Sequence, residues 1–297
     1  MATSPRTSPT VLRWELGARL RALRTRAGLS IDDASKELMC SQAKVSRMET
    51  AGRGIQPRDV RDLCRLYAVS DEVRDELIKM ANDARRPGWW QQYGTLNEQT
   101  ATYIGLESAA TSIMALESRV FPGLLQTPAY AQVLLQALVP LEQVDDMVET
   151  RKRRFERVRN REVQLAALLD EAVFDRTLGR PDIMGDQLEF IIECASRDNI
   201  TIQMIPLTAE PNPGIHGSFM HLAFGGRELL DVIFFESILG NTFVDRPNEV
   251  EQYVHAYEAS EKQALSPEKT LEWLQRRVES SAPQLKPQPR KSPPSPT

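Results

Sequence analysis

An apolar stripe at helical spacing, followed by closely spaced helix signals, limits the first quarter of the chain to a compact helical module. The stripe consists of Leu12, Leu16, Leu20 and Leu23, with arginines between its members. Leucines three and four residues apart lie on one face of a helix, so this face is expected to be buried. Gly28 follows and ends the helix, because glycine readily adopts the backbone conformation found after a helix.

Helix-capping residues mark the elements that come next. Ser30 and Ser41 each precede a short helical segment, and Pro57 stands at the start of a further one. A serine at this place accepts a hydrogen bond from a first-turn N–H group, and proline fits the first helical position. With a fifth segment of helical periodicity, the pattern predicts an all-α domain of five helices over residues 10–84.

Residues 103–279 have a different character, which predicts a mixed α/β domain. Short apolar or alternating runs typical of strands stand between longer helical patterns. The strands are expected at 163–174, 199–207, 218–224 and 228–236. The helices are expected at 104–118, 128–160, 184–197, 247–264 and 267–279. The predicted fold class is α+β, with the five-helix domain first and the mixed α/β domain after it.

The remaining segments are predicted to be irregular. Pro87 and Gly88 interrupt the helical pattern, so residues 85–102, which contain the string PGWW, are assigned to a linker. Residues 1–9 are rich in serine, threonine and proline and predict a disordered arm. The Pro-rich residues 280–297 predict a disordered tail.

Charge is distributed unequally along the chain. Residues 1–86 carry 17 Lys and Arg against 12 Asp and Glu, whereas the remainder carries 20 against 29. A basic N-terminal region followed by an acidic remainder predicts a polyanion-binding module joined to a domain of another kind. The sequence has no apolar run of about 18 residues and no secretory signal pattern, so we expect a cytoplasmic, nucleoid-associated protein with no membrane partner.

Few residues are suited to metal or redox chemistry. The chain has three cysteines, far apart and odd in number, and three histidines. It contains no H-E-x-x-H string, no phosphate-binding loop, no G-x-G-x-x-G string and no G-x-S-x-G string. We therefore expect no catalytic residues, no metal site, no cofactor and no enzymatic activity.

The segment RALRTRAGLSIDDASKELMCSQAKVSRMETAGRG resembles the helix-turn-helix of Xre/Cro-type repressors. The shared features are an arginine four residues before Gly-Leu-Ser, a helix, a short turn that ends in a serine cap, and the string S-R-M-E. The resemblance implies that the second helix of the pair enters the major groove of double-stranded DNA. It places Gln42, Ala43 and Arg47 where this family reads bases, and Ser41 where it grips phosphate.

The chemistry of these side chains agrees with that placement. A glutamine pairs with adenine through two hydrogen bonds, as Gln42 would, and an arginine pairs with guanine O6 and N7, as Arg47 would. Lys44 and Ser46 share or flank the same surface. Cationic side chains beside a reading helix commonly contact phosphate, a role expected for Arg53 and Arg58.

The same resemblance implies an ion pair with a structural role, formed by Arg24 and Glu49. One departure concerns Ile31, which follows the Ser30 cap where the family often has a phosphate-binding glutamine. This change would weaken one backbone contact. A five-helix module that binds protein instead of DNA is the alternative interpretation.

Strings in the rest of the chain resemble a family of actinobacterial regulators, the WhiJ-like regulators, which are paired with small developmental or antitoxin-like partners. The most specific string is FPGLLQTPAYA, and others include DEAVF, GDQLEFI and ALSPEKT. The resemblance covers about 260 residues and makes residues 103–279 a regulatory and dimerisation domain. It implies dimerisation and supplies no catalytic residue. Two recognition helices of a homodimer, one DNA turn apart, would read an inverted repeat.

Further residues form a candidate site for a ligand or partner, and each has a structural alternative. Trp89 and Trp90 could bind a ligand, or they could join two domains. Arg151 and Arg154 belong to a basic run that could contact an acidic partner, or they could form a solvated helix face. His216 lies in a glycine-containing loop that could close over a ligand, or it could be an incidental surface histidine.

Two functions follow from these observations. The first is a sequence-specific transcriptional regulator, as a repressor, whose C-terminal domain senses a small partner protein or a ligand. The second is an antitoxin-like module that mainly captures a small partner protein encoded by a neighbouring gene, with DNA binding serving only autoregulation. Co-purification of such a partner distinguishes the two.

Overall fold

The computed structural model describes residues 8–51, 54–94, 96–176, 178–225, 231–237 and 240–281. The chain divides into two compact units. The first comprises Met1–Met114, Glu162–Gln164 and Phe219–Val254, and the second comprises Ala115–Arg161, Leu165–Ser218 and His255–Thr297. None of the helices described is long and apolar enough to cross a membrane.

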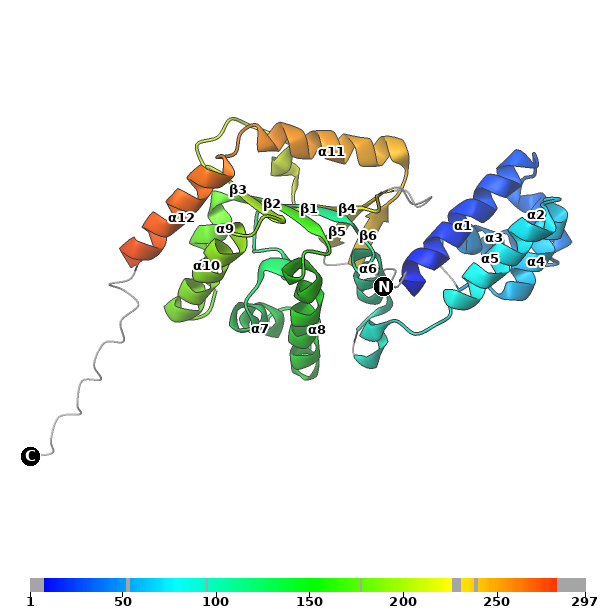
Figure 1. The fold of residues 1–297 in the computed structure, drawn as a ribbon, viewed down its shortest axis with the longest axis horizontal. Helices are drawn as coiled ribbons and strands as arrows, with labels where there is room; N and C mark the ends of the chain where they lie inside the picture. The colour runs from blue at the N-terminus through cyan, green and yellow to red at the C-terminus, as the bar shows by residue number, and fades with distance from the viewer. Residues whose placement is uncertain are drawn as a thin grey trace, which may run out of the picture. The chain divides into compact units, whose positions relative to one another are not determined.

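The first unit begins with a bundle of five helices (Figure 1). They are α1 (Pro9–Arg26), α2 (Ile31–Glu37), α3 (Gln42–Glu49), α4 (Pro57–Leu66) and α5 (Asp71–Asp83). The bundle core contains the buried side chains Leu16, Leu20, Ala34, Val45, Met48, Val60, Leu63 and Leu77. Burying each leucine stabilises the bundle by about 1.5–3 kcal/mol.

Local hydrogen bonds fix where these helices start. The Ser30 hydroxyl accepts from the Asp33 N–H, and the Asp33 carboxylate accepts from the Ser30 N–H, which forms a capping box at α2. Ser41 caps α3 by accepting from the Lys44 N–H at 3.2 Å. Gly28 follows the end of α1 and adopts a left-handed conformation with φ of +72°, as the sequence predicts.

The rest of the first unit combines two short helices with strands and about half of a further helix. These elements are η1 (Trp89–Gln92), α6 (Glu98–Glu107), β4 (Phe219–Ala223), β5 (Val232–Ser237), β6 (Gly240–Val244) and α11 (Pro247–Glu261), which ends in the second unit. Strand β5 pairs antiparallel with β4, with Met220 opposite Phe234, and antiparallel with β6. Tyr103 of α6 stacks on Phe234 with ring centroids 4.0 Å apart, which packs the helix on this sheet.

The second unit contains the parallel strand pair and its helices. Its elements are η2 (Gly123–Leu125), α7 (Pro128–Gln136), α8 (Leu141–Arg159), β2 (Gln164–Asp170), α9 (Glu171–Asp175), α10 (Pro181–Ala195), β3 (Ile200–Ile205), η3 (Pro213–His216) and α12 (Pro267–Ser281). Strands β2 and β3 run parallel, with Leu165 opposite Ile200. The helices α7 and α8 form a hairpin (Figure 1). Edge-to-face contacts of Phe121 with Tyr130 and Phe174, at 5.5 and 5.4 Å, pack the core.

All six strands form one sheet in the order β3-β2-β1-β4-β5-β6, where β1 is Ser112–Glu117. The sheet is mixed, because β2 and β3 are parallel whereas the β4, β5 and β6 pairs are antiparallel. The predicted fold class, a helical domain followed by a mixed α/β domain, is confirmed.

The helix expected at 104–118 is wrong in its second half. Helix α6 ends at Glu107, and residues 112–117 form β1. The Thr111 N–H donates to the Ala223 carbonyl at 2.8 Å, and the Thr111 carbonyl accepts from Gln164 N–H at 3.1 Å. Pairing with strands distant in sequence therefore overrides the local helical pattern.

Two other predictions differ in extent, and one strand was missed. The helical segment 128–160 is divided into α7 and α8 at Pro140, because proline cannot donate the helical hydrogen bond. The strand expected at 163–174 ends at Asp170, whose carboxylate accepts from the Ala172 N–H and caps α9. The short strand β6 was not predicted.

The predicted irregular segments are partly helical. Helix α1 starts at Pro9 and α12 extends to Ser281, so each reaches into a segment assigned to an arm or tail. The assigned linker 85–102 includes η1 and the start of α6. Residues 1–7 and 282–297, and the first residues of the strand expected at 228–236, lie outside the described residues.

Candidate nucleic-acid interface

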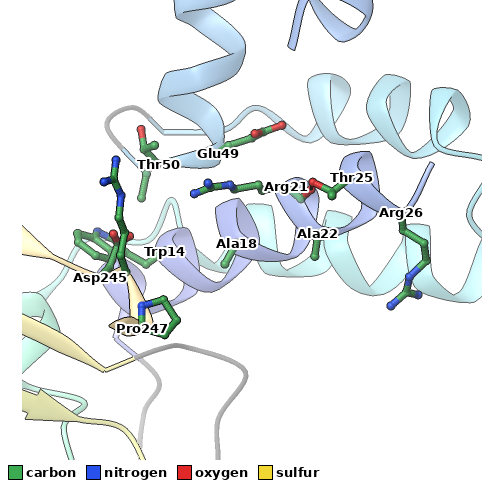
Figure 2. Close-up of a pocket in the computed structure, with 12 residues that line it drawn as sticks. Trp14, Ala18, Arg21, Ala22, Thr25, Arg26, Glu49, Thr50, Asp245 and Pro247 are labelled. Atoms are coloured by element: carbon green, nitrogen blue, oxygen red, sulfur yellow. Dashed lines mark hydrogen bonds between the residues drawn. The ribbon is translucent and has the colours of Figure 1, made fainter. Parts of the chain in front are cut away.

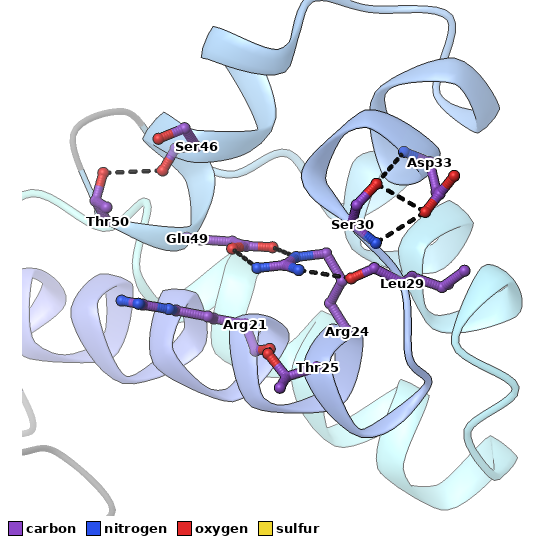
Figure 3. A network of polar contacts seen from close by, with 9 residues as sticks. All are labelled: Arg21, Arg24, Thr25, Leu29, Ser30, Asp33, Ser46, Glu49 and Thr50. Atoms are coloured by element: carbon purple, nitrogen blue, oxygen red, sulfur yellow. Dashed lines mark hydrogen bonds and ion pairs between the residues drawn. The ribbon is translucent and has the colours of Figure 1, made fainter.

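A buried ion pair braces α1 against α3. Arg24 Nε and Nη2 donate to the two carboxylate oxygens of Glu49 at 2.7 and 2.9 Å, and Arg24 Nη1 donates to the Leu29 carbonyl at 2.7 Å (Figure 3). The two side chains are 11% and 3% exposed. The hydrogen bonds to Glu49 raise the pKa of the Arg24 guanidinium, which stays charged. This is the ion pair that the family resemblance implied.

A close backbone approach also holds α1 against α3. A Cβ placed on Gly17 would stand 2.8 Å from the Met48 carbonyl oxygen and 2.9 Å from that of Glu49. These distances are shorter than carbon and oxygen tolerate, so only glycine allows α1 to approach the end of α3 this closely. Glycine here is a packing requirement that the sequence pattern did not reveal.

Gly17→Ala is expected to lower the free energy of unfolding by about 1–3 kcal/mol, because the added methyl group forces the two helices apart. Gly54→Ala is the matched control, since a Cβ at Gly54 meets nothing within 4 Å. Urea unfolding of the full chain measures both variants. Equal stability of the two variants would show that the approach of α1 to α3 is not constrained.

Helix α3 presents one buried and one exposed face. Val45 and Met48 are buried in the bundle core. Gln42, Ala43 and Arg47 are exposed. A helix that is fixed from behind and carries an amide and a guanidinium on its open face can offer hydrogen bonds to base edges.

The other predicted residues of α3 have partners within the bundle. The Ser41 side chain is exposed and caps the helix, as described above. Lys44 Nζ donates to Asp59 Oδ1 at 3.1 Å, so its charge is partly neutralised by an acid that is itself buried. Ser46 is half-buried, and its carbonyl accepts from the Thr50 hydroxyl at 2.9 Å (Figure 3).

Of the two residues after α3 that are predicted to contact phosphate, the structure describes one. Arg58, at the start of α4, has a side chain that is 78% exposed, with Nε 3.9 Å from Asp59 Oδ1. This exposure leaves the guanidinium accessible to a phosphate. Arg53 lies outside the described residues.

The tryptophan pair lies in the first unit. Trp90 is buried, and a Cβ on Gly105 of α6 would stand 2.9 Å from its ring. Trp89 meets Trp90 edge to face at 5.9 Å. Trp90 is therefore part of the packing around α6, and Trp89 is half-buried beside it.

The other members of the candidate ligand site belong to the second unit. The guanidinium groups of Arg151 and Arg154 lie 3.4 and 3.6 Å from the point where a Cβ on Gly123 would stand, so α8 packs these side chains against η2. His216 is exposed at the end of η3. The five residues of the predicted ligand or partner site are therefore divided between the two units.

The histidine that follows in the sequence is placed differently. His221 is buried in β4, and its Nε2 lies 3.0 Å from Asp231 Oδ2. Asp231 Oδ1 also accepts from the Phe224 N–H at 3.3 Å. His221 therefore hydrogen-bonds the residue that directly precedes β5. Among the described residues, no group of three or more His, Cys, Asp or Glu side chains could hold a metal ion.

A hollow of about 600 Å³ lies beside α1 in the first unit (Figure 2). Its lining includes Trp14 and Arg21 of α1, Thr50 after α3, and Asp245 and Pro247. The lining reaches the C-terminal end of α3 but does not include Gln42, Ala43 or Arg47. The hollow is thus separate from the exposed face of α3 that carries Gln42, Ala43 and Arg47.

Comparison with known families finds two matches along the chain. A helix-turn-helix domain matches residues 15–77, and a domain of unknown function, DUF5753, matches residues 100–276. The chain belongs to the DUF5753 family. The DUF5753 match extends from α6 into α12, and the helix-turn-helix match extends from α1 into α5. No curated protein and no solved structure matches this DUF5753 sequence.

The helix-turn-helix match includes both α2 and α3. It supports DNA binding and transcription regulation as the role of this DUF5753 protein. The description of the DUF5753 region states no function for residues 100–276.

Proposed function

We propose that this protein is a sequence-specific transcriptional repressor of the Xre/Cro type that reads double-stranded DNA with α3. The observation that carries the proposal is the exposure of Gln42, Ala43 and Arg47 on a helix whose opposite face is fixed in the bundle core. The Arg24–Glu49 pair holds this helix from behind. Arg58 supplies a cation beside the same helix for a phosphate contact.

The proposal includes a homodimer that reads an inverted repeat. Two copies of α3 one helical turn apart, about 34–36 Å, would occupy successive major grooves on one face of DNA. The DUF5753 region would hold the dimer together and sense a small partner protein or ligand. Support comes from the resemblance of its strings to WhiJ-like actinobacterial regulators.

We propose further that the protein acts by binding, without a catalytic step, in the cytoplasm at the nucleoid. The support is the absence from the sequence of the catalytic strings considered above. The antitoxin-like alternative differs in its main partner, a small protein. Co-purification of that partner in place of operator DNA would favour it.

Arg47→Ala is expected to reduce the preference for guanine at one base pair of each half-site by about 1–3 kcal/mol, while preferences elsewhere stay unchanged. Arg47→Lys is the matched control, because lysine keeps the charge and loses the two-pronged geometry. An operator is first selected from genomic DNA fragments with the purified protein. Fluorescence anisotropy on this selected operator and on its single-base variants then gives the preference at each position.

The lysine variant should therefore lose guanine preference while its salt dependence stays close to that of the wild type. A base-preference profile of Arg47→Ala that matches the wild type at every position would rule out this placement of α3 in the groove.

A further inference from the structure

The first residue of the reading helix is hydrogen-bonded to the helix before it. Gln42 Nε2 donates to Asp32 Oδ1 at 2.8 Å, across the turn between α2 and α3. Gln42 is exposed and Asp32 is half-buried. The contact therefore lies at the surface, where Gln42 would meet DNA.

The chemistry of this contact determines which way the amide faces. An ionised carboxylate accepts hydrogen bonds and donates none, so only the amide nitrogen of Gln42 can face Asp32. Rotating the amide by 180° would place its oxygen against the carboxylate, with two acceptors facing each other. The contact uses one N–H of the amide and leaves the second N–H and the Oε1 atom available.

The groups that remain are those that recognise adenine. In the major groove adenine offers N7 as an acceptor and its N6 amino group as a donor. The second N–H of Gln42 can donate to N7 while Oε1 accepts from N6. An amide that is free to rotate would lose conformational freedom on binding, whereas one that is already oriented loses less.

The carboxylate is itself held in place. Lys36 Nζ lies 2.6 Å from Asp32 Oδ2, one helical turn further along α2. Hydrogen bonds from Lys36 and then from Gln42 lower the pKa of the Asp32 carboxyl, so it is ionised at neutral pH. The capping box of Ser30 and Asp33 fixes the first turn of α2 without using Asp32.

We propose that Asp32 is a positioning residue that orients the Gln42 amide toward DNA and thereby sets the preference for adenine at one base pair of each half-site. The proposal rests on the proposed function of α3. Its ligand is double-stranded DNA, and its effect is confined to the single base pair that Gln42 reads.

A double-mutant cycle tests this role with the full chain on the selected operator. Gln42→Ala identifies the base pair that Gln42 reads and should lower the adenine preference there about 5- to 150-fold. Asp32→Ala should lower the preference at the same base pair by about 5-fold or more. In the Gln42→Ala background, Asp32→Ala should cause no further loss at that position, because the two residues act as one unit.

Glu37→Ala is the matched control for charge. Glu37 is an exposed acid on the same helix, so its removal changes the charge of α2 by the same amount. Asp32→Ala and Glu37→Ala should both bind all sequences somewhat more tightly, because each removes one negative charge near DNA. Only Asp32→Ala should change the adenine preference. Thermal unfolding by circular dichroism checks that the variants fold alike.

The outcomes separate this proposal from the proposed function. If Gln42→Ala changes the preference at one position and Asp32→Ala behaves like Glu37→Ala, the positioning role is wrong and the reading role of α3 stands. If Asp32→Ala tightens binding more than Glu37→Ala does and leaves the adenine preference intact, Asp32 restrains Gln42 without orienting it, which also overturns the proposal. If Gln42→Ala changes no position, the proposed reading face itself is wrong.

Discussion

Arg24→Ala is expected to lower the free energy of unfolding of the helical domain by about 3–5 kcal/mol. The substitution leaves the Glu49 carboxylate buried without its partner, and its side chain is only 3% exposed. It also removes the donor to the Leu29 carbonyl, which shapes the turn before α2. The reading helix would lose its brace together with its stability, so DNA binding should weaken as well.

Amide hydrogen exchange of the full chain measures this effect on α1, α2 and α3 directly. The control is Glu76→Ala, which breaks the ion pair of Glu76 with Arg19, a pair whose carboxylate is 55% exposed. Exposed pairs contribute about 0.2–1 kcal/mol, so the control should change little. Replacing Arg24 and Glu49 together by apolar residues should restore much of the stability. Equal exchange rates in Arg24→Ala and Glu76→Ala would contradict the bracing role.

Gln187→Leu is expected to destabilise the second unit by about 2–4 kcal/mol. Gln187 is fully buried, and its amide holds the segment that leads into α7. Its Nε2 donates to the Leu125 carbonyl at 2.6 Å, and its Oε1 accepts from the Thr127 N–H at 2.7 Å. Leucine has a similar volume but leaves both backbone groups without these partners.

Gln136→Leu is the matched control, because it makes the same chemical change at an exposed position of α7. Exchange of amides in α7 and α10 should accelerate in Gln187→Leu and stay near the wild-type rate in Gln136→Leu. If both variants exchange alike, the buried amide does not hold the segment in place.

Local signals predicted the helical domain well because its elements are defined by short-range interactions. Ser30 and Ser41 cap helices within the next three residues, and the leucine stripe of α1 contains its own spacing. Such patterns can be read from consecutive residues without knowledge of the tertiary structure. The same holds for α10, α11 and α12, which begin at prolines.

The features that the sequence did not predict depend on partners distant in the chain. Strand β1 forms because Thr111 bonds to residues of two other strands, although its residues have a helical pattern. Gly17 matters only because the end of α3 passes beside it. Asp59 takes a hydrogen bond from Lys44, so a residue expected at the DNA surface is partly directed into the bundle.

The candidate reading face also combines features that the sequence predicts with one that it does not. The exposure of Gln42 and Arg47 follows from helical periodicity, since Val45 and Met48 on the opposite side are buried. The contact of Gln42 with Asp32 requires the angle between α2 and α3, which no spacing in the sequence specifies.

The most direct test of the central claim is selection of genomic DNA fragments by the purified full chain, followed by salt-titrated anisotropy on the enriched sites. We predict an enriched inverted repeat with half-sites about one helical turn apart, bound more tightly than unrelated DNA by about 10³-fold or more. Binding that is weak, equally strong on every sequence and lost with rising salt would contradict a reading role for α3.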